Sequence, residues 1–258
     1  MKKLIVLALS AVMAVSLMAC GSAPAAGASG SNGDKVWKIA TDTAFKPFEY
    51  KDDNGDFVGI DMDILAAIAE DQGFKYEVQV LGWDASIAAC QAGQADGMIA
   101  GASITEERKS SGWIFSDGYY DANQCLAVAE NSDITGFEDL NGKSVAVKTG
   151  TMSADYAESI ADKYGFTVTY FEDSPTMYQA VVGGQVAGAM DDAPIMAANI
   201  KDGGLAMKLL PETGNDPASY GFAIFNKDNQ ELVDKFNAGL KNIKANGKYD
   251  EIVKKYLG

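Results

Sequence analysis

Gly97-Met98-Ile99-Ala100-Gly101-Ala102-Ser103-Ile104-Thr105-Glu106-Glu107-Arg108 is the stretch of sequence that indicates the fold. Its first four residues are small or apolar and predict a short strand. Thr105 precedes two acidic residues, which is typical of a helix N-terminus because the threonine side chain can cap the first turn. The stretch therefore predicts a strand that ends in a polar turn and leads into a short helix.

Strands and helices alternate on both sides of this stretch. The apolar patterns predict further strands at residues 36–40, 76–80, 126–129, 144–147, 167–171 and 188–190. They predict helices at residues 61–69, 85–91, 153–164 and 176–182, with Asp61 as the N-cap of the first, and two more helices within 230–256. Alternation of this kind argues for an α/β fold, in which helices cover a sheet.

Polar side chains follow three other predicted strands in the same way. Asp42, Lys148 and Asp192 stand where strands give way to turns. Ligands of open α/β sheets bind beyond the carboxyl ends of the strands. The four segments together predict a ligand site whose residues are far apart in the sequence.

Composition excludes several kinds of function. The chain of 258 residues contains no histidine, so it can hold neither a Ser-His-Asp or Cys-His catalytic centre nor a His-ligated zinc site. Its formal net charge of −15 repels phosphate backbones, which makes nucleic acid a poor partner. We expect no nucleic-acid partner, no metal and no cofactor.

Two motifs resemble binding loops but lack a required residue. Asn141-Gly142-Lys143-Ser144 looks like the end of a phosphate-binding loop, yet the glycine needed five residues before Gly142 is Phe137. Asp52-Asp53-Asn54-Gly55-Asp56 lacks the spacing and the final glutamate of a calcium loop. We predict a turn into a strand at the first motif and a β-hairpin turn at the second.

The N-terminus is typical of an exported lipoprotein. Met1-Lys2-Lys3 precedes an apolar run, and Leu17-Met18-Ala19-Cys20-Gly21 resembles a bacterial lipobox, in which the cysteine is lipidated. We predict a lipoprotein signal peptide at residues 1–19 and lipidation of Cys20, with residues 20–35 as a flexible tether because they are mostly small. The protein would then be extracytoplasmic and anchored to the bacterial cell membrane.

Two further cysteines, Cys90 and Cys125, lie in a predicted helix and a predicted strand. Export permits a disulfide, but the sequence cannot place one. No CxxC pattern is present, so nothing supports metal or redox chemistry. We expect two free, buried thiols.

The four polar segments, together with Asn246-Gly247-Lys248-Tyr249-Asp250-Glu251-Ile252, resemble the extracellular solute-binding proteins of amino-acid ABC importers, family 3, and are most similar to its glutamine-binding members. The resemblance covers residues 36–258. It implies a two-lobed, type II periplasmic-binding-protein fold with a ligand cleft, an ABC permease as partner, and a monomer. Lobe 1 would hold residues 36–117 and 222–258, lobe 2 residues 126–215, and the hinges 118–125 and 216–221.

The resemblance also implies a role for each polar segment. Arg108, the only arginine in the chain, would bind the ligand carboxylate with its planar fork, and Asp192 would bind the ammonium. Burying either ligand charge unpaired would be costly, so both partners are needed. Other expected lining residues are Gly101, Ser103 and Thr151, which would supply hydrogen-bonding groups, and Phe45 and Trp83, which would sandwich the aliphatic part.

The side-chain end of the cleft would be set by Asp42 and Lys148. One accepts hydrogen bonds and the other donates them, which suits the neutral amide of glutamine. Asp191 and Met152 depart from the glutamine-binding pattern, where histidine and glycine are common. If Asp191 paired with Lys148, Asp42 would be free for a cation, so a binder of cationic amino acids, or of cystine, is the alternative.

Two other classes of protein use this fold. Some dehydratases do, and Asp191 beside Asp192 could act as a general acid or base. Sensory modules do too, although these are normally fused to a membrane-spanning segment. We expect no catalytic residue and favour a binding protein that returns its ligand unchanged.

Overall fold

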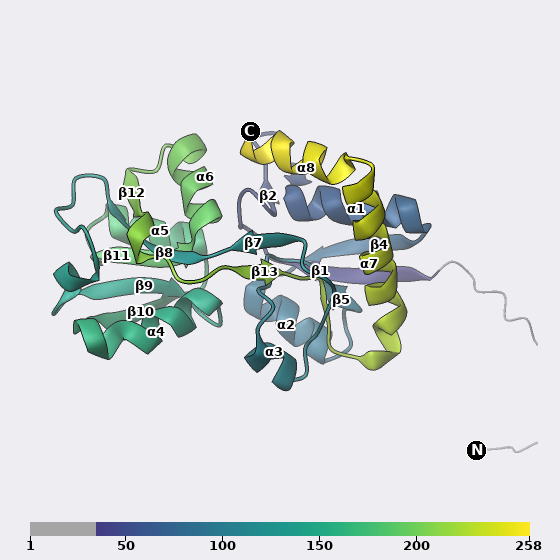
Figure 1. Ribbon diagram of the computed structural model, residues 1–258, viewed down its shortest axis with the longest axis horizontal. Coiled ribbons are helices and arrows are strands. Elements are labelled where there is room, and N and C mark those ends of the chain that lie inside the picture. The colour runs from purple at the N-terminus through teal and green to yellow at the C-terminus, as the bar shows by residue number, and fades with distance from the viewer. Residues whose placement is uncertain (1–34) are drawn as a thin grey trace, which may run out of the picture. The chain divides into compact units, whose positions relative to one another are not determined.

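The computed structural model describes residues 35–258 (Figure 1). The predicted signal peptide, Cys20 and nearly all of the predicted tether lie outside these residues and stay predictions. Within residues 35–258, every helix is too short or too polar to cross a membrane.

One sheet of five strands lies in the lobe that contains both the first and the last described elements. In this sheet, β1 (Val36–Thr41) lies between two parallel neighbours, and β14 (Ala223–Ile224) lies between two antiparallel ones. The order is β4 (Lys75–Val80), β1, β5 (Gly97–Met98), β14 (Ala223–Ile224) and β6 (Ile114–Phe115). The helices of this lobe are α1 (Ile60–Gln72), α2 (Trp83–Gln91), α3 (Glu106–Ser110), α7 (Gln230–Ala245) and α8 (Lys248–Leu257).

A second sheet of five strands forms the other lobe. Its order is β10 (Thr167–Phe171), β9 (Ser144–Lys148), β11 (Gly188–Asp192), β8 (Gln124–Ala129) and β12 (Met207–Leu210). Strands β10, β9 and β11 are parallel, whereas β8 is antiparallel to both of its neighbours. The helices of this lobe are α4 (Met152–Tyr164), α5 (Ser174–Val182) and α6 (Ala193–Gly203).

Both sheets are covered on two faces. In β1, Ile39 packs with α1 and α7, while the next residue, Ala40, packs with α2. In β9, Val145 packs with α4, while Ala146 packs with α5. Side chains of a strand alternate between faces, so each lobe has an apolar layer above and below its sheet.

Two short strands connect the lobes. β7 (Tyr120–Ala122) pairs antiparallel with β13 (Ala218–Tyr220), and Figure 1 shows this pair running from one sheet to the other. The α/β class and the two-lobed arrangement are confirmed. The exact lobe and hinge boundaries stay predictions.

The predicted N-cap role of Asp61 is wrong. Helix α1 begins one residue earlier, and its N-cap is Gly59, whose φ of 142° favours glycine. A Cβ there would lie 2.0 Å from the carbonyl oxygen of Phe48, so the close turn requires glycine. Asp61 is instead fully buried in the first turn of α1, where it accepts hydrogen bonds from another segment.

Most other local predictions are confirmed. Thr105 caps α3 by accepting from the Arg108 N–H, and α7 and α8 are separated at residues 246–247. The loop at Asn54 joins a hairpin of β2 (Tyr50–Lys51) and β3 (Phe57–Val58). Elements that were not predicted are α6 and the short strands β6, β7, β12, β13 and β14, together with 3-10 turns at Phe137–Leu140, Pro211–Thr213 and Lys227–Asn229. Cys90 and Cys125 are free and buried.

Candidate functional site

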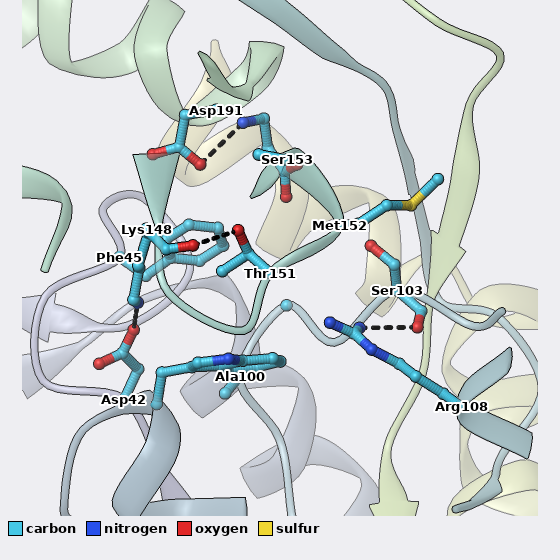
Figure 2. Close-up of a pocket in the computed structure, with 13 residues that line it drawn as sticks. Asp42, Phe45, Ala100, Ser103, Arg108, Lys148, Thr151, Met152, Ser153 and Asp191 are labelled. Carbon is cyan, nitrogen blue, oxygen red and sulfur yellow. Dashed lines mark hydrogen bonds and ion pairs between the residues drawn. The ribbon is translucent and has the colours of Figure 1, made fainter. Parts of the chain in front are cut away.

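A small cavity lies where the polar strand ends of the two lobes face each other. All eleven of the predicted ligand-binding residues line it, together with two that were not predicted, Ala100 and Ser153. Figure 2 shows Arg108 and Ser103 at one end of the cavity and Asp42 and Lys148 at the other. The structure thus brings the predicted residues together, and their binding roles stay predictions.

Arg108 occupies the end of the cavity expected to hold a carboxylate. Its guanidinium donates to the carbonyl oxygen of Ser103 at 2.9 Å. It also donates to the carbonyl oxygen of Gly150, which belongs to the other lobe, at 3.3 Å. Burial lowers the pKa of Arg108 from its ordinary value, while Asp155 and Asp192 act in the opposite direction. A guanidinium is charged throughout the physiological pH range, and backbone acceptors on both sides of the cleft fix the position of this cation.

Two tryptophan rings flank this guanidinium. Its central carbon lies 5.2 Å from the ring centre of Trp83 and 5.1 Å from that of Trp113. Such contacts attract a cation and prefer a flat one. Trp113 was not predicted, and it does not line the cavity; it holds Arg108 from behind. No local sequence pattern marks Trp113, because only the fold shows that its ring contacts Arg108.

Asp192 stands at the end of β11, and both oxygens of its carboxylate are occupied. One accepts from Gln124 Nε2 at 2.5 Å and from Ser153 Oγ at 3.5 Å, and the other accepts from the Tyr220 hydroxyl. Its side chain does not cap α6, although it occupies the N-cap position. Gln124 and Tyr220 lie at the ends of the connecting segments, so the site is braced by the residues that link the lobes.

Asp191 is held by neutral donors rather than by a cation. Its carboxylate accepts from Ser174 Oγ at 2.8 Å, from the Tyr178 hydroxyl at 2.7 Å and from the N–H of Asp192 at 2.9 Å. Burial raises its pKa. The pairing of Asp191 with Lys148, considered from the sequence, is not what the structure shows.

Lys148 forms its ion pair with Asp42 instead. Both side chains are buried, with 3% and 4% of their surfaces exposed, and they come from different lobes. The ammonium also lies 5.4 Å from the ring centre of Phe45 and 5.8 Å from that of Trp83. The slot expected to take the aliphatic part of a ligand therefore holds a cation in this structure.

Backbone geometry shapes the remaining wall. Gly101 has a φ of 56°, and a Cβ on it would lie 2.5 Å from the Phe45 ring, so glycine is needed for this close approach. Thr151 accepts from the Ala154 N–H as the N-cap of α4 and donates to the Lys148 carbonyl at 2.7 Å. Met152 is the first residue of α4 and also lines the cavity.

Acid should weaken binding of any ligand whose ammonium needs an ionised Asp192. Burial and then the neighbouring Asp191 raise the pKa of Asp192 to about 6. Below that pH a proton must leave before the ammonium can pair, so the dissociation constant should rise by up to about tenfold per pH unit. Above it, affinity should be flat. Calorimetric titrations between pH 5 and pH 8 measure this, and an unchanged dissociation constant at pH 5 would contradict it.

The chain is similar to known proteins over almost all of the described residues. Residues 37–258 match the profile of the bacterial extracellular solute-binding proteins, family 3. The chain is 31% identical over 258 residues to the arginine-binding extracellular protein ArtP of Bacillus subtilis, covering all of this chain and 98% of that one. It is 32% identical over 276 residues to the ABC transporter glutamine-binding protein GlnH of the same organism, again covering all of this chain and 98% of the other.

A solved ancestral arginine-binding protein is similar in three dimensions. Its structure bound to arginine has a TM-score of 0.78 and 34% identity, over 86% of this chain and 98% of that one. Its structure bound to glutamine has the same TM-score and coverage, with 35% identity. Overall similarity therefore does not separate a cationic ligand from an amide.

Proposed function

The chain belongs to the bacterial extracellular solute-binding proteins of family 3, and from this membership we propose that it binds a free amino acid outside the membrane and delivers it to an ABC importer. The observation that carries the proposal is a cation and a carboxylate, Arg108 and Asp192, lining one cavity. An amino acid brings the opposite pair of charges. Each would be costly to bury alone and is stabilised by the matching partner.

The proposed location is extracytoplasmic, as for the family. A lipid on Cys20 would hold the protein at the membrane surface, near its permease. The curated relatives compared above are named for binding, which favours transport over the dehydratase hypothesis. The dehydratase hypothesis uses Asp191 and Asp192 as a general acid or base. In the structure, hydroxyl, amide and backbone donors already bind the carboxylate oxygens of both buried residues.

We place the hinges at residues 118–125 and 216–221, where β7 and β13 cross between the lobes. A ligand that contacts both lobes favours the closed state through contacts that the open state lacks. Small-angle scattering is expected to give a smaller radius of gyration at saturating ligand than without ligand. An identical profile in both conditions would argue against hinge closure.

For the ligand side chain we propose glutamine. Asp42 and Lys148, which pair directly with each other in this structure, offer an acceptor and a donor from opposite lobes. An amide can donate to the first and accept from the second. A charged side chain would attract one partner and repel the other, and like charges in a dry cleft cost several kcal/mol, so the pair selects by repulsion as well as by attraction.

A cationic amino acid is the second candidate. The slot between Phe45 and Trp83 already accommodates an ammonium, that of Lys148, and a ligand cation would find the same aromatic faces. Arginine-binding relatives support this candidate. One argument against this candidate is that the sequence analysis required Asp191 to pair with Lys148 and so free Asp42 for the ligand cation. In the structure, Asp191 instead accepts hydrogen bonds from Ser174 and Tyr178.

Competition among glutamine, glutamate, arginine, lysine and cystine tests the choice. Glutamine is expected to bind most tightly to the wild type. Lys148→Met removes the donor and frees Asp42, so glutamine should lose roughly one to two decades of affinity, the worth of a hydrogen bond to a charged group, while arginine gains. Lys143→Met, at an exposed turn before the same strand, is the matched control. If arginine or lysine already binds more tightly to the wild type, glutamine is the wrong ligand and amino-acid binding still stands.

A further inference from the structure

Two carboxyl groups are completely buried in lobe 1, directly behind the cavity wall. Glu49 and Asp61 are both 0% exposed. Glu49 lies in the turn that also carries Phe45, and Asp61 lies in the first turn of α1. Neither belongs to a salt bridge in the part of the chain that the structure describes.

The hydrogen bonds of this pair are incomplete if both groups are ionised. Asp61 Oδ2 accepts from the Gly101 N–H at 2.9 Å and from the Tyr119 hydroxyl at 2.9 Å. Among residues 35–258, Asp61 Oδ1 and both oxygens of Glu49 have no donor. The two residues lie in neighbouring segments, because the Asp61 N–H donates to the carbonyl oxygen of Phe48, the residue before Glu49, at 3.0 Å.

One proton accounts for this arrangement. Two adjacent buried carboxylates without a cation would be strongly unfavourable, whereas a protonated Glu49 can donate to Asp61 Oδ1. Burial, and then the charges of Asp61 and Asp42, raise the pKa of Glu49 well above its ordinary value. Burial also raises the pKa of Asp61, to about 6, while the Gly101 and Tyr119 donors act in the opposite direction. These directions favour Glu49 as the carboxyl group that keeps the proton.

Few other charged or titratable groups face the pair. Asp42 and Lys148 act on Glu49 with opposite signs and are paired with each other. Tyr119 faces both carboxyls, and Tyr249 faces Asp61 from α8; burial raises the pKa of each of these phenols. None of these groups donates to Asp61 Oδ1, which has no hydrogen-bond donor among residues 35–258.

We propose that Glu49 and Asp61 share a single buried proton and act together as a positioning pair for the amino-acid site. Asp61 fixes the peptide N–H of Gly101, whose left-handed conformation shapes the cavity wall. It also fixes Tyr119, the residue before the connecting strand β7. The positioning role rests on the proposed function, whereas the shared proton does not.

Unfolding equilibria of the whole chain test the proton. In Glu49→Gln the side-chain amide donates to Asp61 but does not titrate. A raised folded pKa gives stability that is full below the unfolded pKa of about 4.5, declines above it, and is lost once the pH passes the folded pKa. Above about pH 4.5, and until the pH passes the folded pKa, the unfolding constant of the wild type should therefore rise by up to about tenfold per pH unit relative to the variant. Equal pH slopes would overturn the shared proton.

Ligand titrations near neutral pH, with glutamine and with arginine, test the positioning role. Glu49→Gln should bind within about twofold of the wild type because the donor is kept. Glu49→Leu, which fills space without a donor, should weaken binding of both amino acids at least tenfold, and Glu77→Leu on exposed β4 is the control. Equal affinity of the Leu and Gln variants would overturn the positioning role. If the wild type binds no amino acid, the proposed function fails, and the unfolding slopes still decide the proton.

Discussion

Arg108→Ala is expected to weaken amino-acid binding by roughly two to four decades. In a closed cleft the ligand carboxylate would lose its cation, and breaking a buried pair in this way costs about 3–5 kcal/mol. No other arginine exists in the chain to replace it. The loss should be similar for glutamine and arginine, because both present the same carboxylate. Isothermal titration calorimetry on the purified variant measures it.

Lys109→Ala is the matched control for this loss. Lys109 is the next residue of α3 but is exposed and pairs with Glu106 on the surface, so its removal should leave the dissociation constant unchanged. An Arg108→Ala variant that binds within tenfold of the wild type would show that the carboxylate anchor lies elsewhere.

Asp192→Asn should cost roughly two decades or more. The variant keeps the size of the side chain but removes the charge that we propose pairs with the ligand ammonium, and hydrogen bonds to charged groups are worth about 1.5–3 kcal/mol with a further penalty when the partner stays buried. Titration with an amino acid and with its analogue lacking the amino group separates this effect from a distortion of the hinge.

The two ligands should respond differently to the variant. The analogue should bind the wild type and Asp192→Asn equally weakly, since neither complex contains the ammonium pair. Asp202→Asn, an exposed change at the far end of α6, should affect neither ligand. A normal affinity of Asp192→Asn for the amino acid would remove Asp192 from the site.

The polar residues that follow strands could be predicted because their position carries information. Asp42, Lys148 and Asp192 each stand beyond an apolar strand, and parallel strands bring such positions to one edge. Asp61 begins an apolar helix in the same manner, yet the structure buries it as a partner of Gly101. Sequence alone could not distinguish a cap from a buried acceptor, because the second segment is 40 residues away.

Short elements and supporting residues were missed for a different reason. Strands of two or three residues, such as β14 and β13, are too short to show a period. Tyr220 donates to Asp192 from a segment distant in sequence, and Trp113 lies close to Arg108 in the sequence, but no local pattern marks either of them. For the same reason, the choice of Asp42 over Asp191 as the partner of Lys148 required the fold.

The position of β14 has a consequence for the order in which the chain folds. The sheet of lobe 2 is drawn from one continuous stretch that ends with β12 at Leu210. The sheet of lobe 1 is incomplete until β14 enters between β5 and β6, and α7 packs against α1 only later still. Lobe 2 can therefore fold while synthesis is still under way. The first half of lobe 1 must wait with apolar surface uncovered, which makes it the part of the nascent protein that most needs protection from aggregation.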